Sequence, residues 1–233
     1  MPLFLRYRAD QLSEIIDQPD CDPVKLFRTY RQFKYINQLT SQWRRVYCHL
    51  LRPTMRKKKR HYQLLDIGCG GGDITFALMK WAEEDQLSLK ITAIDHDPRV
   101  LDFLQQINDH NGIQFLCTDL NDLYEMDEQF DFIISNNLVH HLSSTAFNEI
   151  MTKCEHMVRI QVIFNDIERS DIAWLGFACF ASPLLHRSYI VPDGLRSIRR
   201  SYSKAEAEKS VRKNWIIKRY FPYRLLFTYE KDI

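Results

Sequence analysis

Apolar and polar positions follow two alternating spacings through the middle of the chain. Five short apolar runs are each followed by turn residues, and between them apolar residues recur every three or four positions. The first pattern is typical of buried strands and the second of amphipathic helices. Because strands alternate with helices through short connections, the sequence predicts a parallel, doubly wound α/β sheet. The five predicted strands are Gln63–Ile67, Leu89–Ile94, Ile113–Cys117, Phe130–Ser135 and Arg159–Asn165.

The segment before this alternation predicts helices. Asp22 followed by Pro23 is typical of a helix start, because aspartate caps free backbone N–H groups and proline suits the first turn. From Leu26 onward apolar residues recur with helical spacing, and we expect a break near Thr40 and an end before Pro53.

The ends of the chain complete the predicted organisation. Trp215–Phe221 and Tyr223–Tyr229 indicate two further strands that close the sheet as an antiparallel hairpin. We expect an N-terminal helical cap with a basic linker over residues 1–60, and a single domain over residues 61–233. The linker contains the run Arg56-Lys57-Lys58-Lys59-Arg60, which is expected to be solvated but could also contact an acidic surface or lipid headgroups.

Composition narrows the class of protein. The chain of 233 residues is 45% hydrophobic and 27% charged, with a net charge of +2, so nothing in the overall charge favours a nucleic-acid partner. Its six cysteines are scattered without metal-ligand spacing, which indicates reduced thiols and a cytoplasmic location. No secretory signal and no apolar run of membrane-spanning length is present in this sequence.

The most informative stretch is Leu64-Leu65-Asp66-Ile67-Gly68-Cys69-Gly70-Gly71-Gly72-Asp73, where four of the seven glycines fall within five residues. A strand, a glycine-rich turn and a helix present backbone to a nucleotide-like ligand. Asp73 stands where the dinucleotide fingerprint needs its third glycine, and we expect its carboxylate to cap the following helix. A phosphate at that helix end would meet this negative charge, which argues against NAD. A ligand with an adenosine and a cationic tail fits better.

These residues resemble the D-x-G-x-G-x-G motif of class I S-adenosylmethionine-dependent methyltransferases, with Asp66, Gly68, Gly70 and Gly72 in the matching positions. The resemblance covers about residues 60–230. It implies S-adenosylmethionine as cofactor and a Rossmann-like seven-stranded sheet that is mostly parallel, with an antiparallel C-terminal strand.

Acidic residues that end the next strands complete the expected cofactor site. Asp95 lies about as far beyond the glycines as an acid that grips ribose hydroxyls, although it could instead only cap the next helix. The resemblance implies that Asp119 accepts a hydrogen bond from the adenine amino group, and a plain turn aspartate is the alternative. The cofactor-binding residues expected are Asp66, Gly68, Cys69, Gly70, Asp73, Asp95, His96, Asp119, Leu120 and Asn136.

A pair of histidines follows the fourth strand, at the edge of the sheet that faces the ligand. His140 or His141 could act as a general base near neutral pH, or the pair could only pack beneath the cofactor. Asp166 is the remaining candidate catalytic residue. The His-His-Leu stretch is similar to one found in small-molecule methylases such as quinol methyltransferases. Flanking segments such as 164–170 are similar to methyltransferases found with type III polyketide synthases, which act on phenolic or quinol-like compounds.

The alternation of strands and helices stops after Asp166. Residues 167–202 are longer than an ordinary connection, and such segments usually form lids or binding walls. We expect a helical lid over the open edge of the sheet, or a segment that only packs in the core. The side chains expected to line an acceptor pocket are Trp174, Phe177 and Phe180, with Arg199 and Arg200 available to a polar or acidic end.

The function predicted from these observations is methyl transfer to a small phenolic or quinol-like acceptor. The N-P-P-Y signature of amino-group methylases is absent from the sequence, and contact with a membrane surface is not favoured. Two alternatives stay open: an RNA methyltransferase, suggested by residues 56–60, and a non-catalytic binding protein with a nucleotide fold. No metal is expected.

Overall fold

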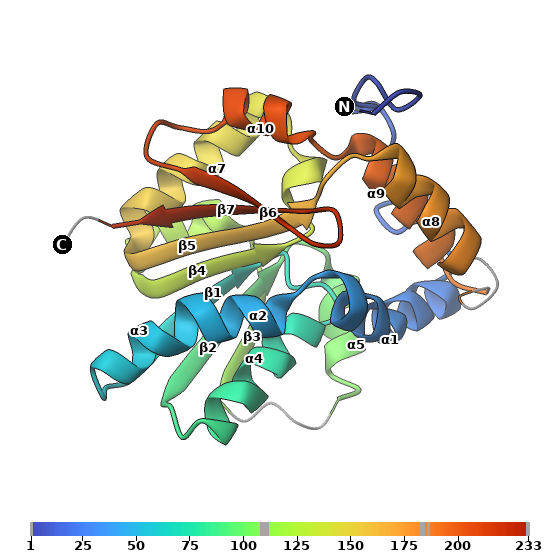
Figure 1. Cartoon of the computed structure of the whole chain (residues 1–233). Helices are drawn as coiled ribbons and strands as arrows, with labels where there is room; N and C mark the ends of the chain where they lie inside the picture. Colours follow the sequence, from blue (N-terminus) through green and yellow to red (C-terminus); the bar gives the residue numbers. More distant parts are fainter. Residues whose placement is uncertain (1, 108–111, 182–184, 186, 232–233) are drawn as a thin grey trace.

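A single seven-stranded sheet organises the computed structural model, which describes residues 2–107, 112–181, 185 and 187–231 (Figure 1). The strand order is β3-β2-β1-β4-β5-β7-β6. The strands are β1 (Tyr62–Ile67), β2 (Leu89–Asp95), β3 (Ile113–Cys117), β4 (Phe130–Asn136), β5 (Val158–Ile167), β6 (Ile216–Tyr220) and β7 (Arg224–Glu230). Strands β1 to β5 pair in parallel, whereas β7 pairs antiparallel with both β5 and β6. The predicted fold is therefore confirmed, including the antiparallel closing hairpin.

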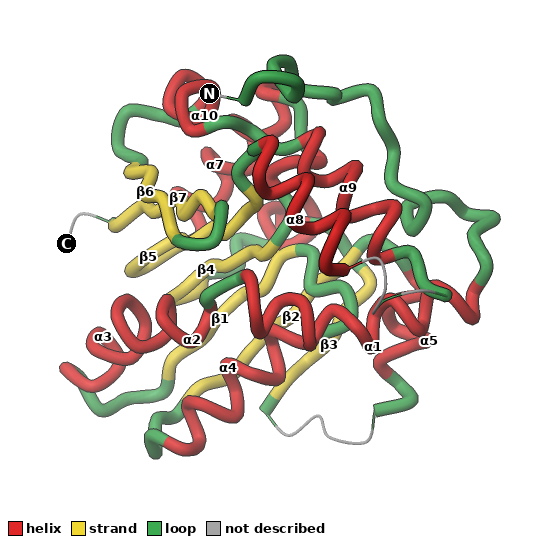
Figure 2. Tube along the Cα trace, turned by 45° about the vertical axis from the view of Figure 1, so that its right-hand side comes forward, coloured by secondary structure: helices red, strands yellow, loops and turns green. Residues whose placement is uncertain are grey.

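Helices cover both faces of the sheet (Figure 2). Successive residues of a strand point to opposite faces, so Leu64 packs with α4 and the N-terminal helices while Leu65 packs with α7 and α10. The helices are α1 (Pro23–Thr40), α2 (Trp43–Val46), η1 (Tyr47–Leu51), α3 (Arg52–Lys57), α4 (Asp73–Glu84), α5 (Pro98–Leu104), α6 (Leu120–Glu125), η2 (Val139–His141), α7 (Ser144–Met157), α8 (Asp171–Ala181), α9 (Ile190–Arg200) and α10 (Lys204–Ser210).

The N-terminal helix is interrupted, as the sequence predicts, but it does not end before Pro53. Asp22 caps α1, and Gln42 has a positive φ of 57° at the break between α1 and α2. The chain then forms a π-helical turn, η1, and Pro53 lies in the first turn of α3. The π-helical turn explains why the predicted helix end is wrong. Proline would interrupt i→i−4 hydrogen bonds, but the wider turn before Pro53 already replaces them.

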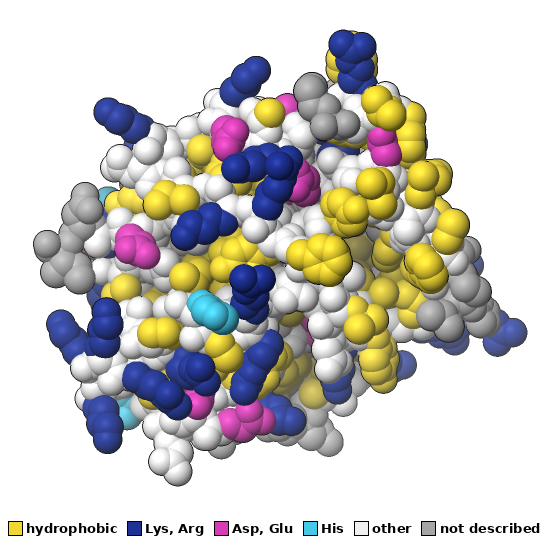
Figure 3. Space-filling view, in the orientation of Figure 1, with side chains coloured by type: hydrophobic (Ala, Val, Ile, Leu, Met, Phe, Trp, Pro, Cys, Tyr) yellow, Lys and Arg dark blue, Asp and Glu magenta, His cyan; other side chains and the backbone are white. Residues whose placement is uncertain are grey.

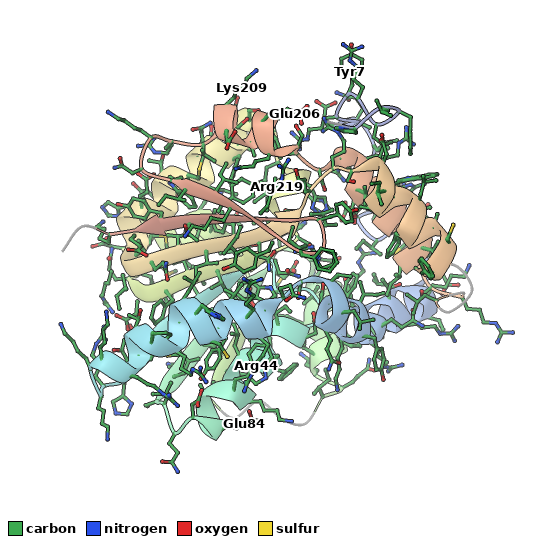
Figure 4. All side chains as sticks on the ribbon, viewed as in Figure 1. Tyr7, Arg44, Glu84, Glu206, Lys209 and Arg219 are labelled. Atoms are coloured by element: carbon green, nitrogen blue, oxygen red, sulfur yellow. The ribbon has the colours of Figure 1, made fainter. Side chains whose placement is uncertain are left out.

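The basic run at residues 56–60 is a helix end rather than a simple linker. Arg56 and Lys57 form the last turn of α3, and Arg56 pairs with Asp85 at 2.8 Å. Arg60 makes two hydrogen bonds, of 3.0 and 2.7 Å, with the buried carboxylate of Asp131. A second exposed pair, Arg44–Glu84, joins α2 to α4 on the same side of the sheet (Figure 4). Of these arginines, Arg60 links the segment to the sheet, whereas Arg44 and Arg56 link it to the end of α4.

Two insertion helices, α8 and α9, lie beyond the carboxyl ends of the strands, where α9 contacts α1 (Figure 1). The N-terminal segment is fastened to them by side-chain hydrogen bonds to its backbone. Asp171 accepts from Leu5 N–H at 2.9 Å, and Asp193 accepts from Ile15 N–H at 2.8 Å. Tyr7, in contrast, points away from the body at the tip of this segment (Figure 4). Residues before α1 therefore form part of the same structural unit as α9.

Candidate active site

The glycine-rich turn after β1 is shaped by two different constraints. Gly68 and Gly70 have φ values of 70° and 50°, a region that side chains rarely adopt. A Cβ atom on Gly71 would lie 3.0 Å from the Cβ of Tyr30, so α1 packs directly on the turn. A Cβ on Gly70 would meet no atom within 4 Å, because this glycine faces open space. The turn thus leaves room for a ligand at Gly70.

Two acids lie beside this turn. The side chain of Asp66 lies in the core, where Thr75 donates a hydrogen bond of 2.6 Å to it. Burial raises the pKa of Asp66 to about 7. The residue that caps α4 is Gly72, so the helix begins one position earlier than predicted and Asp73 is its first residue. Burial raises the pKa of Asp73 to about 6, although hydrogen bonds from Asn37 and from the first backbone N–H groups of the helix lower it in part. Both acids can therefore change charge near neutral pH.

Asp95 is held close to the glycine turn. Its carboxylate accepts hydrogen bonds from the N–H groups of Gly70 and Asp97, each at 3.0 Å, and burial raises its pKa. A carboxylate has about four acceptor positions, so it can still accept from ribose hydroxyls. The neighbouring His96 is exposed, with its Nδ1 3.6 Å from Asp95.

The remaining predicted cofactor residues divide into two groups. Asn136 lies in the same cleft as the glycines, where its Oδ1 accepts from the Trp43 indole at 2.9 Å. Asp119 and Leu120 do not line this cleft, because the Asp119 carboxylate caps α6 through the backbone of residues 121 and 122. The contact between Asp119 and adenine stays a prediction.

One cleft of about 870 Å³ brings most of the predicted residues together at the carboxyl edge of the sheet. From the predicted cofactor set it includes Asp66, Gly68, Cys69, Gly70, Asp73, Asp95, His96 and Asn136. From the predicted catalytic set it includes His140 and His141, whereas Asp166 lies buried behind them. The glycine turn and the histidine pair are thus two ends of a continuous cavity.

His140 is held between two carboxylates. Its Nδ1 lies 2.7 Å from Asp166 and its Nε2 lies 3.2 Å from Glu14, and only 2% of the residue is exposed. Burial by itself lowers the pKa of this imidazole, but the two carboxylates outweigh it and raise the pKa to about 9. The positive imidazole lowers the pKa of Glu14 to about 2 and also lowers that of Asp166, against the effect of burial. A protonated histidine with both nitrogens engaged cannot act as a general base at neutral pH.

His141 is the more accessible member of the pair, with 26% of its side chain exposed. Its Nε2 lies 3.6 Å from Glu14 and its Nδ1 lies 3.5 Å from Asp17. Arg200 of α9 approaches from the same side, 3.8 Å from Asp17, and donates to the backbone carbonyl of His141 at 3.4 Å. The far end of the cleft therefore carries two histidines, two carboxylates and an arginine.

Comparison with known proteins agrees with this arrangement. Residues 64–161 match the sequence model of a family described as "Methyltransferase domain". These residues form a methyltransferase domain. The resemblance to the class I S-adenosylmethionine-dependent methyltransferases is therefore confirmed, both for the fold and for the domain that carries the cofactor motif.

Individual relatives of the methyltransferase domain cover different shares of the chain. Malonyl-[acyl-carrier protein] O-methyltransferase from Acetivibrio thermocellus is 30% identical over 34% of this chain and 26% of its own length. Ubiquinone biosynthesis O-methyltransferase from Sinorhizobium medicae is 27% identical over 59% of this chain and 53% of its own. The chain thus matches about half or less of these curated relatives.

A solved structure is similar over nearly the whole fold. The plantazolicin methyltransferase BpumL, in complex with SAH, has a TM-score of 0.66 at 15% identity and covers 94% of this chain and 93% of its own. At this identity the likeness extends the fold assignment beyond residues 64–161, and concerns the fold alone.

The most important residue that sequence reasoning missed is Glu14. It lies in the N-terminal segment outside the methyltransferase domain, yet it is 4% exposed and contacts both histidines. Ser197 of α9 also donates to it at 2.6 Å. No local pattern distinguishes this acid from others in an irregular segment. Its unusual property is burial, which the structure shows and the sequence does not.

The expected acceptor wall on α8 is wrong for the described cleft, which none of its three aromatic residues lines. The ring of Phe177 packs on Gly194 of α9, and Trp174 makes an edge contact with Phe4 at 5.9 Å. Phe180 is 78% exposed, and Ile172 and Leu175 of the same helix are exposed as well. Hydrophobic side chains gather on this side of the molecule in the space-filling view (Figure 3). Arg199 lies outside the cleft as well, whereas Arg200 lines it as expected. Helix α8 is therefore one layer too far out, and α9 forms the wall.

Among the described residues, none of the helices has both the length and the apolar character needed to cross a bilayer.

Proposed function

We propose that the chain is an S-adenosylmethionine-dependent methyltransferase that acts on a small acceptor, most simply a phenolic or quinol-like hydroxyl. The observation that carries this proposal is the single cleft that joins the glycine turn to the wall formed by Glu14, His141 and Arg200. One end has the features of a cofactor site, and the other has ionisable groups suited to an acceptor.

The cofactor end fits the donor. Gly70 leaves open space beside the turn, and Asp95 can accept from ribose hydroxyls while the backbone holds it in place. S-adenosylmethionine, when bound, supplies a methyl group activated by a sulfonium. Asp73 would place negative charge near that cation, because it lines this cleft. A protein of similar fold supports this interpretation, since BpumL was solved with SAH.

The acceptor end would orient the nucleophile and remove its proton. Methyl transfer from an activated donor depends mainly on the alignment of the two reactants, with proton removal where the acceptor is a hydroxyl. His140 is already protonated and instead holds Glu14 in position. Proton removal therefore falls to His141, which is partly exposed to the cleft and lies 3.6 Å from the Glu14 carboxylate.

The alternative of an RNA methyltransferase is not favoured. Arg56 and Arg60 are paired with Asp85 and Asp131, and they precede the start of β1, whereas the cleft lies beyond the carboxyl ends of the strands. A basic path toward the cleft would be needed for RNA, and this run does not provide one.

The test is methyl transfer from donor carrying a deuterated methyl group, offered with separate pools of phenols, quinols and RNA. We expect the label in the phenol or quinol pool, as detected by mass spectrometry, and tighter binding of SAH than of NAD by calorimetry. Label in RNA alone would favour the alternative substrate. Binding of SAH without label in any pool would favour a non-catalytic binding protein.

A further inference from the structure

The wall of the cleft has a feature that proton removal does not require. The Nε2 atoms of both histidines point to the same carboxylate oxygen, Oε1 of Glu14, at 3.2 Å for His140 and 3.6 Å for His141. The three ligand atoms all lie within 4.8 Å of one another. Ligands bound to one tetrahedral cation at about 2.0–2.1 Å are separated by roughly 3.4 Å, so small adjustments of these side chains suffice to hold a cation.

The outer contacts of both histidines follow the pattern of metal ligands. Nδ1 of His140 lies 2.7 Å from Asp166, and Nδ1 of His141 lies 3.5 Å from Asp17. A histidine that binds a metal through Nε2 almost always donates its Nδ1–H to a carboxylate or carbonyl, which fixes the tautomer. An ion pair between His140 and Glu14 would not require a second histidine facing the same carboxylate.

Arg200 provides an independent observation at the same place. It is only 7% exposed and lines the cleft, yet its Nε and Nη1 atoms have no hydrogen-bond partner within the part of the chain that the structure describes. Its nearest charged group is Asp17, at 3.8 Å. A buried guanidinium with free donors is costly unless an anionic oxygen pairs with it.

We propose that Glu14, His140 and His141 bind a divalent cation of the zinc type, with an open coordination position toward the cleft. Two histidines and one glutamate are a donor set that zinc uses in catalytic sites, where a further position stays open to water or substrate. Mg²⁺ prefers oxygen ligands, so a site with two imidazole nitrogens does not favour it. On binding, the cation replaces the proton that His140 shares with Glu14, and that proton goes to solvent.

This inference rests on the proposed function only for the chemistry that the cation would perform. A hydroxyl oxygen coordinated at the open position would lose its proton to solvent more readily, because the cation stabilises the resulting oxyanion. The free donors of Arg200 could then pair with that oxyanion. His141 would serve as a ligand rather than as the group that takes the proton.

The test measures cation binding directly, on the purified chain with any affinity tag removed. Calorimetry with ZnCl₂ should give one site per chain, and CoCl₂ should give a visible absorption spectrum typical of tetrahedral coordination. MgCl₂ should not compete. Glu14→Gln and His141→Ala should each weaken zinc binding at least about tenfold, and Asp17→Asn should weaken it about tenfold. The matched control is His49→Ala, an exposed histidine on η1, which should bind zinc as the unmodified chain does.

Parallel titrations with SAH separate the possible failures. Absence of zinc binding while SAH binds normally would overturn the cation site and leave the proposed function intact. Equal zinc affinity in His141→Ala, Glu14→Gln and His49→Ala would also overturn it, because the bound zinc would then lie elsewhere. Zinc binding without SAH binding would retain the site and contradict the proposed function. Once the acceptor is known, a chelator should lower turnover without changing SAH affinity.

Discussion

The two ends of the cleft are built in different ways. The cofactor end is assembled from consecutive residues of the methyltransferase domain, in which β1, the glycine turn and α4 follow one another and Asp95 ends the next strand. The opposite end combines His141 with Glu14 and Arg200, which lie outside residues 64–161 on either side. The first end is defined by backbone conformation and the second by contacts between distant side chains. Variation at the second end can change the acceptor while the donor site stays the same.

The largest expected effect separates the two ends. Glu14→Ala removes the carboxylate that faces both histidines, so we expect turnover to fall by about 10²–10⁴-fold while SAH affinity changes less than about threefold. Turnover is measured with the acceptor identified by labelling, and SAH binding by calorimetry. A parallel loss of SAH affinity would mean that the two ends are not independent.

The second-largest effect expected is a change with pH in the free energy of unfolding, which depends on the acceptor end. The pKa of His140 is raised to about 9 in the folded chain, against about 6.5 when unfolded, so its contribution is complete below pH 6.5 and is lost as pH rises through 9. The shift corresponds to about 3 kcal/mol. Urea unfolding in the presence of a chelator should therefore show a falling free energy from pH 6.5 to 9.5. His140→Gln should lack this decline, and an equal decline in that variant would assign it to other groups.

The sequence predicted the cofactor end of the cleft better than the acceptor end. The parallel order of strands, the glycine turn and the place of Asp95 depend on local spacing, and all are confirmed in the fold. The continuation of the helix past Pro53 was missed because a π-helical turn has no marker in the apolar pattern. Glu14 was missed because its burial depends on contacts with residues more than a hundred positions away. Local rules predict backbone, whereas such contacts depend on the complete fold.

At the cofactor end, a smaller effect is expected from one acid. Asp95→Ala removes charge-assisted hydrogen bonds worth roughly 1.5–3 kcal/mol each, so SAH affinity should fall at least about tenfold. Turnover at saturating donor should stay within a few-fold. Asp119→Ala is the comparison, since its carboxylate caps α6 outside the cleft. A tenfold loss in that variant would support the predicted adenine contact instead.

The smallest expected effect tests whether α8 has any part in the acceptor end. A Cβ on Gly194 would lie 2.4 Å from the ring of Phe177, so Gly194→Ala must displace that ring from α9. Overpacking costs about 1–3 kcal/mol, and the better helix propensity of alanine returns up to about 1, which leaves a net loss of about 1 kcal/mol. Phe180→Ser is the matched control, because an exposed side chain should change stability by less than about 0.5 kcal/mol. Urea unfolding measures both variants. Since α8 does not line the cleft, neither variant should alter the KM for the acceptor, and an increase in Phe180→Ser would return α8 to the binding wall.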